Sequence, residues 1–320
     1  MALPPLSVFA PPVLLLVAML AIARPGRRPG AVPRLAEGAA LAALGLAVAG
    51  LVQFVAAGSS AVATPVTAGL RFDVVSVTMI LVVAFVGWVV VRYARSYLDG
   101  EAREGAFHGL MLAALASVMA LVQAGTLPVL VAAFIAVGLT MRQLLLFFSE
   151  RAEARRAAAK FTLVWGLGDA ALIMAMLLLW WAFGTVEIGA LNAAAAGGLP
   201  LAAQIAVVLV VLAAALKTAA FPLHGWLTEV MEAPTPVSAL LHAGIINAGG
   251  VLLLAVAGLV QASPGAMAAL TMLGGFTAMF GAVVMLTQSA IKTALAWSTV
   301  AQMGFMLLQC GLGLWPLALL

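Results

Sequence analysis

Charged side chains are scarce in this 320-residue sequence, in which Asp, Glu, Lys and Arg together make up only 8% of the residues. A soluble domain carries about 25% of such residues, so the composition excludes an ordinary water-soluble globular protein. Hydrophobic residues account for 65% of the chain. This excess is typical of a protein that crosses a membrane several times.

Cysteine is almost absent as well, because Cys310 is the only one. A single cysteine excludes a disulfide framework, a cysteine-based zinc site and an iron–sulfur cluster built by this chain alone. The sequence also lacks GxGxxG after a strand, a P-loop and HExxH. We therefore expect no catalytic residues, no bound cofactor and no metal, and we do not expect this chain to be an enzyme.

Long apolar runs dominate what remains, and a helix that crosses a bilayer needs about 20 such residues. We predict an all-α, polytopic membrane protein with about ten transmembrane helices in a single membrane domain. The runs cover 6–23, 38–57, 73–92, 107–124, 126–148, 161–183, 199–221, 235–259, 265–287 and 291–314.

Basic residues gather in alternate loops between these runs. The positive-inside rule places such loops in the cytoplasm, so we expect the N-terminus on the outer face of the cell inner membrane. The first apolar run precedes its arginines, the reverse of a secretory signal, and is interpreted as a retained span. The net charge of +4 thus reports topology, and we expect no nucleic-acid partner. The basic loop residues are Arg24, Arg27, Arg28, Arg34, Arg92, Arg95, Arg103, Arg151, Arg155, Arg156 and Lys160, and Arg71 is the only one in the intervening loops.

Lys217 lies well inside the seventh run, where an ionisable group is costly and marks a functional path by default. Pro222 follows five residues later, lacks an N–H and crowds the carbonyl of Thr218. We therefore expect a broken helix near Lys217, which membrane proteins tolerate where the backbone lines a hydrated cavity. A lysine there suits a proton carrier. Alternatively, its long stem reaches a lipid head group.

Two histidines follow this break, and histidine exchanges protons near neutral pH. His224 comes directly after it, and His242 lies in the eighth run. We expect Thr235 to cap that helix and Pro236 to occupy its first turn, which places His242 about 10 Å into the helix. His242 is then either a second proton carrier or a neutral interhelical hydrogen-bond donor.

Four further ionisable residues complete the candidate proton path. Asp169 is the only acid clearly within the sixth run, and Lys217 is its expected partner. Glu229 and Glu232 are three residues apart and share a helix face. They either exchange protons with solvent or form an ordinary interfacial pair. Lys292 begins the tenth run and is either a second relay lysine or a cytoplasmic anchor.

Two stretches resemble the proton-translocating module that antiporter-like subunits of respiratory complex I share with Mrp-type sodium/proton antiporters. They are "PLHGWLTEVMEAPTPVSALLHAGIINAGG" and "AIKTALAWSTVAQMGF", and the second matches "DIKxxLAYSTxSQxG" with Ala290 in place of aspartate. By motif position the resemblance makes Lys217, His242 and Lys292 the lysine of helix seven, the histidine of helix eight and the lysine of helix ten.

The same resemblance implies an antiporter-like fold with inverted repeats. We assign residues 1–105 to N-terminal helices, 106–260 to the first repeat and 261–320 to the start of a second repeat. Members of the superfamily continue beyond this point in two repeated halves, so we expect the chain to be a fragment.

One branch of the superfamily fits best. The stretch "LTMRQLLLFFSERAEARRAAAKFTLVWGLGD" is similar to the corresponding pattern of DabB, the membrane subunit of Dab-type inorganic-carbon accumulation systems. Complex I subunits carry a Trp-Glu pair in helix five whose glutamate partners the helix-seven lysine, whereas Phe134-Ile135 stand there in this chain, and Arg142 follows. The resemblance implies a DabA-like, zinc-containing soluble partner and an ion gradient of H+ or Na+ that drives CO2 and bicarbonate uptake.

Two other functions remain open. An antiporter-like subunit of a complex I-type NADH:quinone oxidoreductase or of an Mrp antiporter would copurify with electron-transfer or antiporter subunits. A membrane scaffold that only anchors a partner would keep its function after neutralisation of Lys217 and His242. The cost of placing these groups in lipid argues against the scaffold.

Overall fold

The computed structural model describes residues 4–57, 64–66, 69–230 and 233–319. Helices make up most of this part of the chain, which confirms the all-α expectation. A short hairpin interrupts them, in which β1 (Thr64–Val66) pairs antiparallel with β2 (Leu70–Phe72). The chain divides into two compact units. Unit 1 comprises Met1–Gly125, Ala132–Ser149 and Ala233–Ile245, and unit 2 comprises Thr126–Val131, Glu150–Glu232 and Ile246–Leu320.

Six helices within the described ranges are long and apolar enough to cross a membrane. Two shorter apolar helical segments, Leu6–Ile22 and Leu201–Lys217, accompany them. The six are α2 (Val32–Ala57), α3 (Val74–Tyr97), α4 (Glu104–Val122), α5 with its 3-10 continuation (Leu127–Phe148), α6 (Ala152–Phe183) and α13 (Pro264–Leu286).

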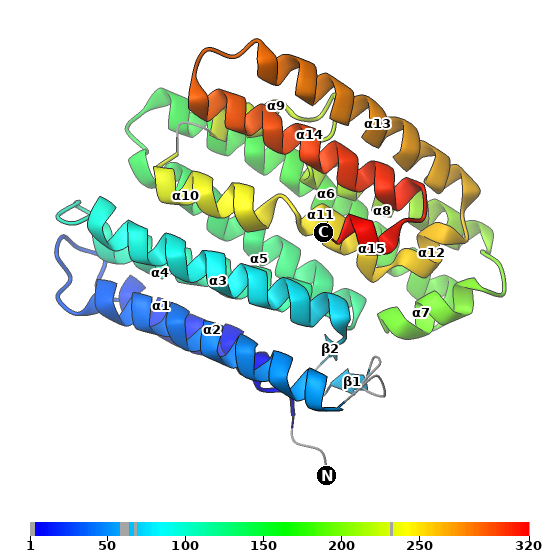
Figure 1. The fold of residues 1–320 in the computed structure, drawn as a ribbon, viewed down its shortest axis with the longest axis horizontal. Coiled ribbons are helices and arrows are strands. Elements are labelled where there is room, and N and C mark those ends of the chain that lie inside the picture. The colour runs from blue at the N-terminus through cyan, green and yellow to red at the C-terminus, as the bar shows by residue number, and fades with distance from the viewer. Residues whose placement is uncertain (1–3, 58–63, 67–68, 231–232, 320) are drawn as a thin grey trace. The chain divides into compact units, whose positions relative to one another are not determined.

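In unit 1, α1 (Ala10–Ile22) packs against α2 and α4, and α3 packs against α2, α4 and the short helix α10 (Thr235–Leu240) (Figure 1). Glycine permits the close approach of α4 to α1, as small residues do in membrane helices. A Cβ atom added at Gly109 would lie 2.6 Å from Cγ1 of Ile22 and 2.9 Å from the carbonyl oxygen of Ala18. Helix α4 is accordingly buried along most of its length.

The loop before α3 fixes where that helix begins. Asp73 accepts a 2.7 Å hydrogen bond from the N–H of Ser76, and the hydroxyl of Ser76 accepts one of 2.9 Å from the N–H of Asp73. This reciprocal capping satisfies two backbone donors at the start of the helix. Arg71, the basic residue outside the basic loops, lies beside this cap, with its Nε 3.6 Å from Oδ2 of Asp73. Burial lowers the pKa of the Arg71 guanidinium, and the Asp73 carboxylate opposes that shift.

In unit 2, α8 (Leu201–Lys217) lies beside α6 and α11 (Ala248–Ala255), and α13 lies beside α14 (Ile291–Gly311) (Figure 1). Two short helices, α7 (Ile188–Ala195) and α12 (Ala257–Gln261), pack together, and α15 (Trp315–Ala318) follows α14. Gly281 of α13 faces the backbone of Ala301 of α14, where an added Cβ would lie 2.7 Å from the amide nitrogen. Small residues therefore hold α13 and α14 close together.

The expected break near Lys217 is present. Helix α8 ends at Lys217, and the next helix, α9 (Gly225–Glu229), begins only after Pro222. The eighth apolar run is divided too, because α10 passes into a π-helical segment, Leu241–Ile245, before α11 begins. The expectation of one continuous helix over 235–259 was therefore wrong. Single π turns of this kind occur inside helices, frequently at functional sites.

The expected cap of the eighth run was wrong by one residue. Pro234 is the N-cap, with ψ 142° in the extended region, and Thr235 is already the first helical residue. No side chain hydrogen-bonds to the cap, so the Thr235 hydroxyl does not play the expected part. Pro236 does lie in the first turn, where its missing N–H would have had no helical partner.

Candidate functional site

Lys217 is paired inside unit 2. Its Nζ lies 2.6 Å from Oδ1 of Asp169, which projects from the middle of α6. The Lys217 side chain is 0% exposed and that of Asp169 is 16% exposed. The expected pairing of these two residues is therefore present, and Lys217 does not reach out to a head group. A buried charge needs such a partner because desolvation alone would be very costly.

Aromatic rings form a wall of this site. The Trp165 ring lies 4.2 Å from Nζ of Lys217, close enough for a cation–π interaction. Phe161 stacks on Trp165 at 5.0 Å between ring centroids, and Trp226 meets Trp165 edge-on at 6.0 Å. The indole N–H of Trp226 donates a 3.1 Å hydrogen bond to the carbonyl of Leu216. That carbonyl lies in the last turn of α8, where helical partners are missing.

Gly168 makes room for the lysine stem. A Cβ atom at this position would lie 3.2 Å from Cε of Lys217 and 3.5 Å from its Nζ. Trp165, Gly168 and Asp169 are three and four residues apart, so they share one face of α6. This face therefore provides the cation–π ring, the space and the carboxylate for a single lysine.

Several backbone groups at the break are hydrogen-bonded to other protein groups. The Thr218 hydroxyl donates to the carbonyl of Ala214 at 2.8 Å, and the N–H of Ala220 donates to Ala215 at 3.0 Å. The N–H of Phe221 donates a 3.1 Å hydrogen bond to the hydroxyl of Thr277 on α13. These contacts stabilise a non-helical segment immediately after a buried charge, as irregular backbone in a membrane protein requires.

A second lysine–carboxylate pair joins Lys160 of α6 to a carboxylate of α9. Nζ of Lys160 is 2.6 Å from Oε1 of Glu229, the last residue of α9. The two side chains are 44% and 30% exposed. Glu229 was expected to pair with or lie beside Glu232, which falls outside the described residues. Its observed partner, Lys160, had been interpreted only as a topology signal.

His224 lies among aromatic rings. Its imidazole stacks on Phe221 at 5.5 Å and contacts Trp297 at 5.0 Å and Phe280 at 5.8 Å. Its Nδ1 is buried without a hydrogen-bond partner among the described residues. His224 therefore follows the break as expected, in surroundings that are mostly apolar.

The two other predicted residues that the structure describes belong to different compact units. His242 is half-buried in the π-helical segment of unit 1, whereas Lys292 is exposed in the first turn of α14 in unit 2. Within the described ranges, no three His, Cys, Asp or Glu side chains lie close enough together to hold a metal ion.

Sequence reasoning missed Lys160 and Trp165. A signal for Trp165 was available, because Phe161, Trp165 and Asp169 recur every four residues and so fall on one helix face.

The apolar Phe134-Ile135 pair belongs to α5, where Phe134 is fully buried. The carboxylate that faces Lys217 therefore comes from α6.

Two family descriptions match the chain. "NADH:quinone oxidoreductase/Mrp antiporter, TM" matches residues 124–319, which is well over half of the sequence. "NADH-Ubiquinone oxidoreductase (complex I), chain 5 N-terminus" matches residues 60–108.

Curated relatives carry two kinds of name. The probable inorganic carbon transporter subunit DabB2 of Halothiobacillus neapolitanus is 40% identical over 87% of this chain and 53% of its own length. The probable subunit DabB of Hydrogenovibrio crunogenus is 42% identical over 77% of this chain and 48% of its own length. NADH-quinone oxidoreductase subunit L of Mycobacterium tuberculosis is 35% identical over 77% of this chain. The chain thus spans about half the length of the DabB relatives it matches.

Solved structures agree with these matches. The Mrp complex from Dietzia sp. DQ12-45-1b aligns with 96% of this chain and 34% of its own chain at a TM-score of 0.81 and 28% identity. The archaeal membrane-bound sulfane sulfur reductase shares the fold, with a TM-score of 0.85 at 19% identity. The chain belongs to the NADH:quinone oxidoreductase/Mrp antiporter transmembrane family.

Proposed function

We propose that this chain is an ion-conducting membrane subunit of an energy-coupled complex that takes up CO2 and bicarbonate. The observation that carries the proposal is the Lys217–Asp169 pair, buried at a helix break and joined at 2.6 Å. The inorganic-carbon assignment is supported by the DabB relatives, which are 40–42% identical. Transport rather than catalysis is the role, because the relatives with these names are transporter subunits.

The buried pair acts as a switch for a passing cation. A lysine and a carboxylate in an apolar site are stable only while both charges face each other. A proton or Na+ that approaches Asp169 competes with Lys217 for the carboxylate. The released ammonium then has to lose its proton or find another partner, so one ion's arrival changes the charge at the helix break. The coupling ion is H+ or Na+.

The proton path extends from this pair through the other predicted residues. Glu229 is the solvent-facing end, since its side chain is 30% exposed and its Oε1 is paired with Lys160, while its Oε2 is buried. His224 follows the break among apolar rings. The path includes three further proton carriers, because ionisable groups in membrane segments tend to mark ion pathways. They are Glu232, Lys292 and His242.

The membrane arrangement that goes with this role has about ten spans and inverted repeats. Residues 1–105 form N-terminal helices, 106–260 the first repeat and 261–320 the start of the second. The alternating basic loops support an N-terminus on the outer face of the cell inner membrane. A DabA-like, zinc-containing soluble subunit is the partner.

Replacement of Lys217 tests the proposal in cells that lack carbonic anhydrase and depend on the complex to grow in ambient air. Lys217→Ala is expected to abolish growth in air while growth in high CO2 continues. Lys160→Ala removes a lysine of the exposed pair on the same helix and is expected to retain most of the rescue. Membrane abundance of each variant, measured by immunoblot, separates loss of conduction from loss of protein. Growth of Lys217→Ala in air at the wild-type rate would refute the role of Lys217.

A second function is favoured by a specific observation, the match to the Mrp complex at a TM-score of 0.81 and 28% identity. Purification from native membranes in mild detergent, followed by mass spectrometry, distinguishes the two. A large zinc-containing soluble partner supports inorganic-carbon uptake. Quinone-reductase or antiporter subunits would instead place the chain in a complex I-type or Mrp-type assembly.

A further inference from the structure

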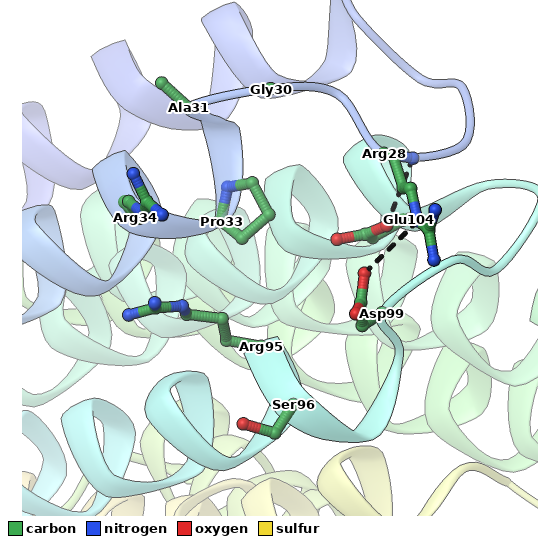
Figure 2. A pocket seen from close by; sticks show the side chains of 9 residues that line it. All are labelled: Arg28, Gly30, Ala31, Pro33, Arg34, Arg95, Ser96, Asp99 and Glu104. Atoms are coloured by element: carbon green, nitrogen blue, oxygen red, sulfur yellow. Dashed lines mark hydrogen bonds and ion pairs between the residues drawn. The ribbon is translucent and has the colours of Figure 1, made fainter.

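A pocket of about 690 Å³ opens in unit 1, among residues that do not belong to the Lys217 site. Its lining includes the turn before α2, the first turn of α2 and the last turn of α3 (Figure 2). Three of the nine lining residues are arginines, and Ser96 adds a hydroxyl. The nine are Arg28, Gly30, Ala31, Pro33, Arg34, Arg95, Ser96, Asp99 and Glu104.

Charge is divided across this pocket. Figure 2 shows Arg34 and Arg95 on one side and Asp99 and Glu104 together with Arg28 on the other. Glu104 is 3% exposed, and its Oε2 accepts hydrogen bonds from the N–H groups of Arg28 and Gly100 at 3.2 and 3.1 Å. Asp99 lies 3.7 Å from Nε of Arg28. Both carboxylates are therefore already engaged on their own side.

On the opposite side of the pocket, one of the two arginines forms no ion pair with a described residue. Arg95 pairs with Glu37 at 2.7 Å, but Arg34 is exposed and forms no ion pair with any described residue. Arg34 also lies in the first turn of α2, a helix of 26 residues, whose N-terminal end carries partial positive charge. Two guanidinium groups, a hydroxyl and a helix start are the groups that bind a phosphate oxyanion.

The surface below Arg34 shows which phosphate compound fits. Gly38, Leu41, Gly45, Val48, Val52 and Val55 are exposed and follow Arg34 at helical spacing along one face of α2. From Arg34 to Val55 this apolar stripe is about 32 Å long, at 1.5 Å per residue. That length matches the hydrocarbon thickness of a bilayer, about 30 Å. Arg34 is thus expected at the level of the lipid head groups, directly above a surface suited to acyl chains.

We propose that this pocket binds the phosphodiester of a membrane glycerophospholipid. The phosphate lies against Arg34 and Arg95, and its acyl chains lie along the exposed stripe of α2. Basic pockets of membrane helices near the bilayer surface bind lipid head groups in this manner. The proposal concerns a site outside the ion path and does not depend on the nature of the coupling ion.

The test measures lipid retained by the purified, immobilised full-length chain after delipidation and re-addition of defined probes. Tritium-labelled phosphatidylglycerol is the first probe, diacylglycerol tests the need for phosphate, and orthophosphate tests the need for acyl chains. We expect saturable retention of phosphatidylglycerol, little retention of diacylglycerol and no competition by millimolar orthophosphate. Equal retention of diacylglycerol, or full competition by orthophosphate, would overturn the lipid assignment.

Arg34→Gln identifies the pocket as the site. Because it removes a charge-assisted hydrogen bond, we expect about tenfold weaker retention of phosphatidylglycerol. The matched control is Arg27→Gln, which removes an exposed arginine of the same loop that does not line the pocket. Arg34→Lys should recover part of the binding. Arg34 makes no internal ion pair, so the variant is expected to fold, as checked by its melting temperature. Equal retention by the Arg34→Gln and Arg27→Gln variants would refute the site.

Discussion

Helix α6 carries one member of each of two lysine–carboxylate pairs, and the two pairs have the same N–O distance of 2.6 Å. Lys160 pairs with Glu229 near the start of the helix, and Asp169 pairs with Lys217 nine residues further on, about 13 Å along the axis. The first pair is 44% and 30% exposed, whereas the second is 0% and 16% exposed. The N–O distance therefore does not distinguish the functions of the two pairs.

Burial makes the two pairs different in energy. An exposed ion pair contributes about 0–1 kcal/mol, because water already solvates both charges. In a buried pair each ion has lost its hydration, so removal of one partner leaves the other without compensation. A change in the charge of either partner at the helix break therefore leaves an uncompensated buried charge, which destabilises the surrounding structure. In the exposed pair, water still reaches part of both side chains.

The strongest way to break this comparison is Asp169→Leu. It leaves the Lys217 ammonium buried against Trp165 without a counter-charge, and the expected loss of stability is about 3–5 kcal/mol. Thermal unfolding in detergent measures it as a lower melting temperature. The double variant Lys217→Met with Asp169→Leu removes both charges and should recover most of the stability while conduction remains lost. If the single variant is as stable as the wild type, the pair does not compensate buried charge.

A smaller effect is expected when the space for the lysine is filled. Gly168→Ala places a Cβ 3.2 Å from Cε of Lys217, and overpacking of this kind costs about 1–3 kcal/mol. Gly166→Ala is the matched control, because nothing lies within 4 Å of an added Cβ there. The control is expected to gain up to about 1 kcal/mol from helix propensity. Ion conduction should fall in the first variant alone, and equal behaviour of the two would remove Gly168 from the site.

The helix break and the Lys217–Asp169 pair could be predicted from the sequence for a physical reason. A charge inside an apolar run is so costly that a partner must exist, and Asp169 is the only acid clearly within a neighbouring run. Pro222 likewise marks the break, because it cannot continue the hydrogen-bond ladder of a helix. Because so few charged residues lie in the apolar runs, the Lys217–Asp169 pair could be predicted from the sequence.

Other contacts depend on how helices meet in space. The sequence assigns Lys160 to a basic loop, where the positive-inside rule explains the residue without any partner, so its pairing with Glu229 could not be anticipated. The cap at Pro234 and the π-helical turn around His242 depend on local backbone geometry that composition does not specify. Similarly, the basic loops predicted orientation, whereas the pocket beside Arg34 required α2 and α3 to be placed together.

The smallest effect should come from Lys160→Gln, and it sharpens the comparison through salt. Because both partners are substantially exposed, the variant should lose no more than about 1 kcal/mol. Salt screens exposed charges over about 10 Å at 0.1 M and over shorter distances at higher concentration. The difference in melting temperature between wild type and Lys160→Gln should therefore shrink between about 0.05 and about 0.5 M NaCl, values about threefold either side of physiological ionic strength. The difference caused by Asp169→Leu should persist, since the Lys217 side chain is 0% exposed and bulk salt screens a buried charge much less than an exposed one. A salt-independent Lys160 effect would mean that both pairs act as buried charges, and the distinction between a solvent-facing end and a buried switch would fail.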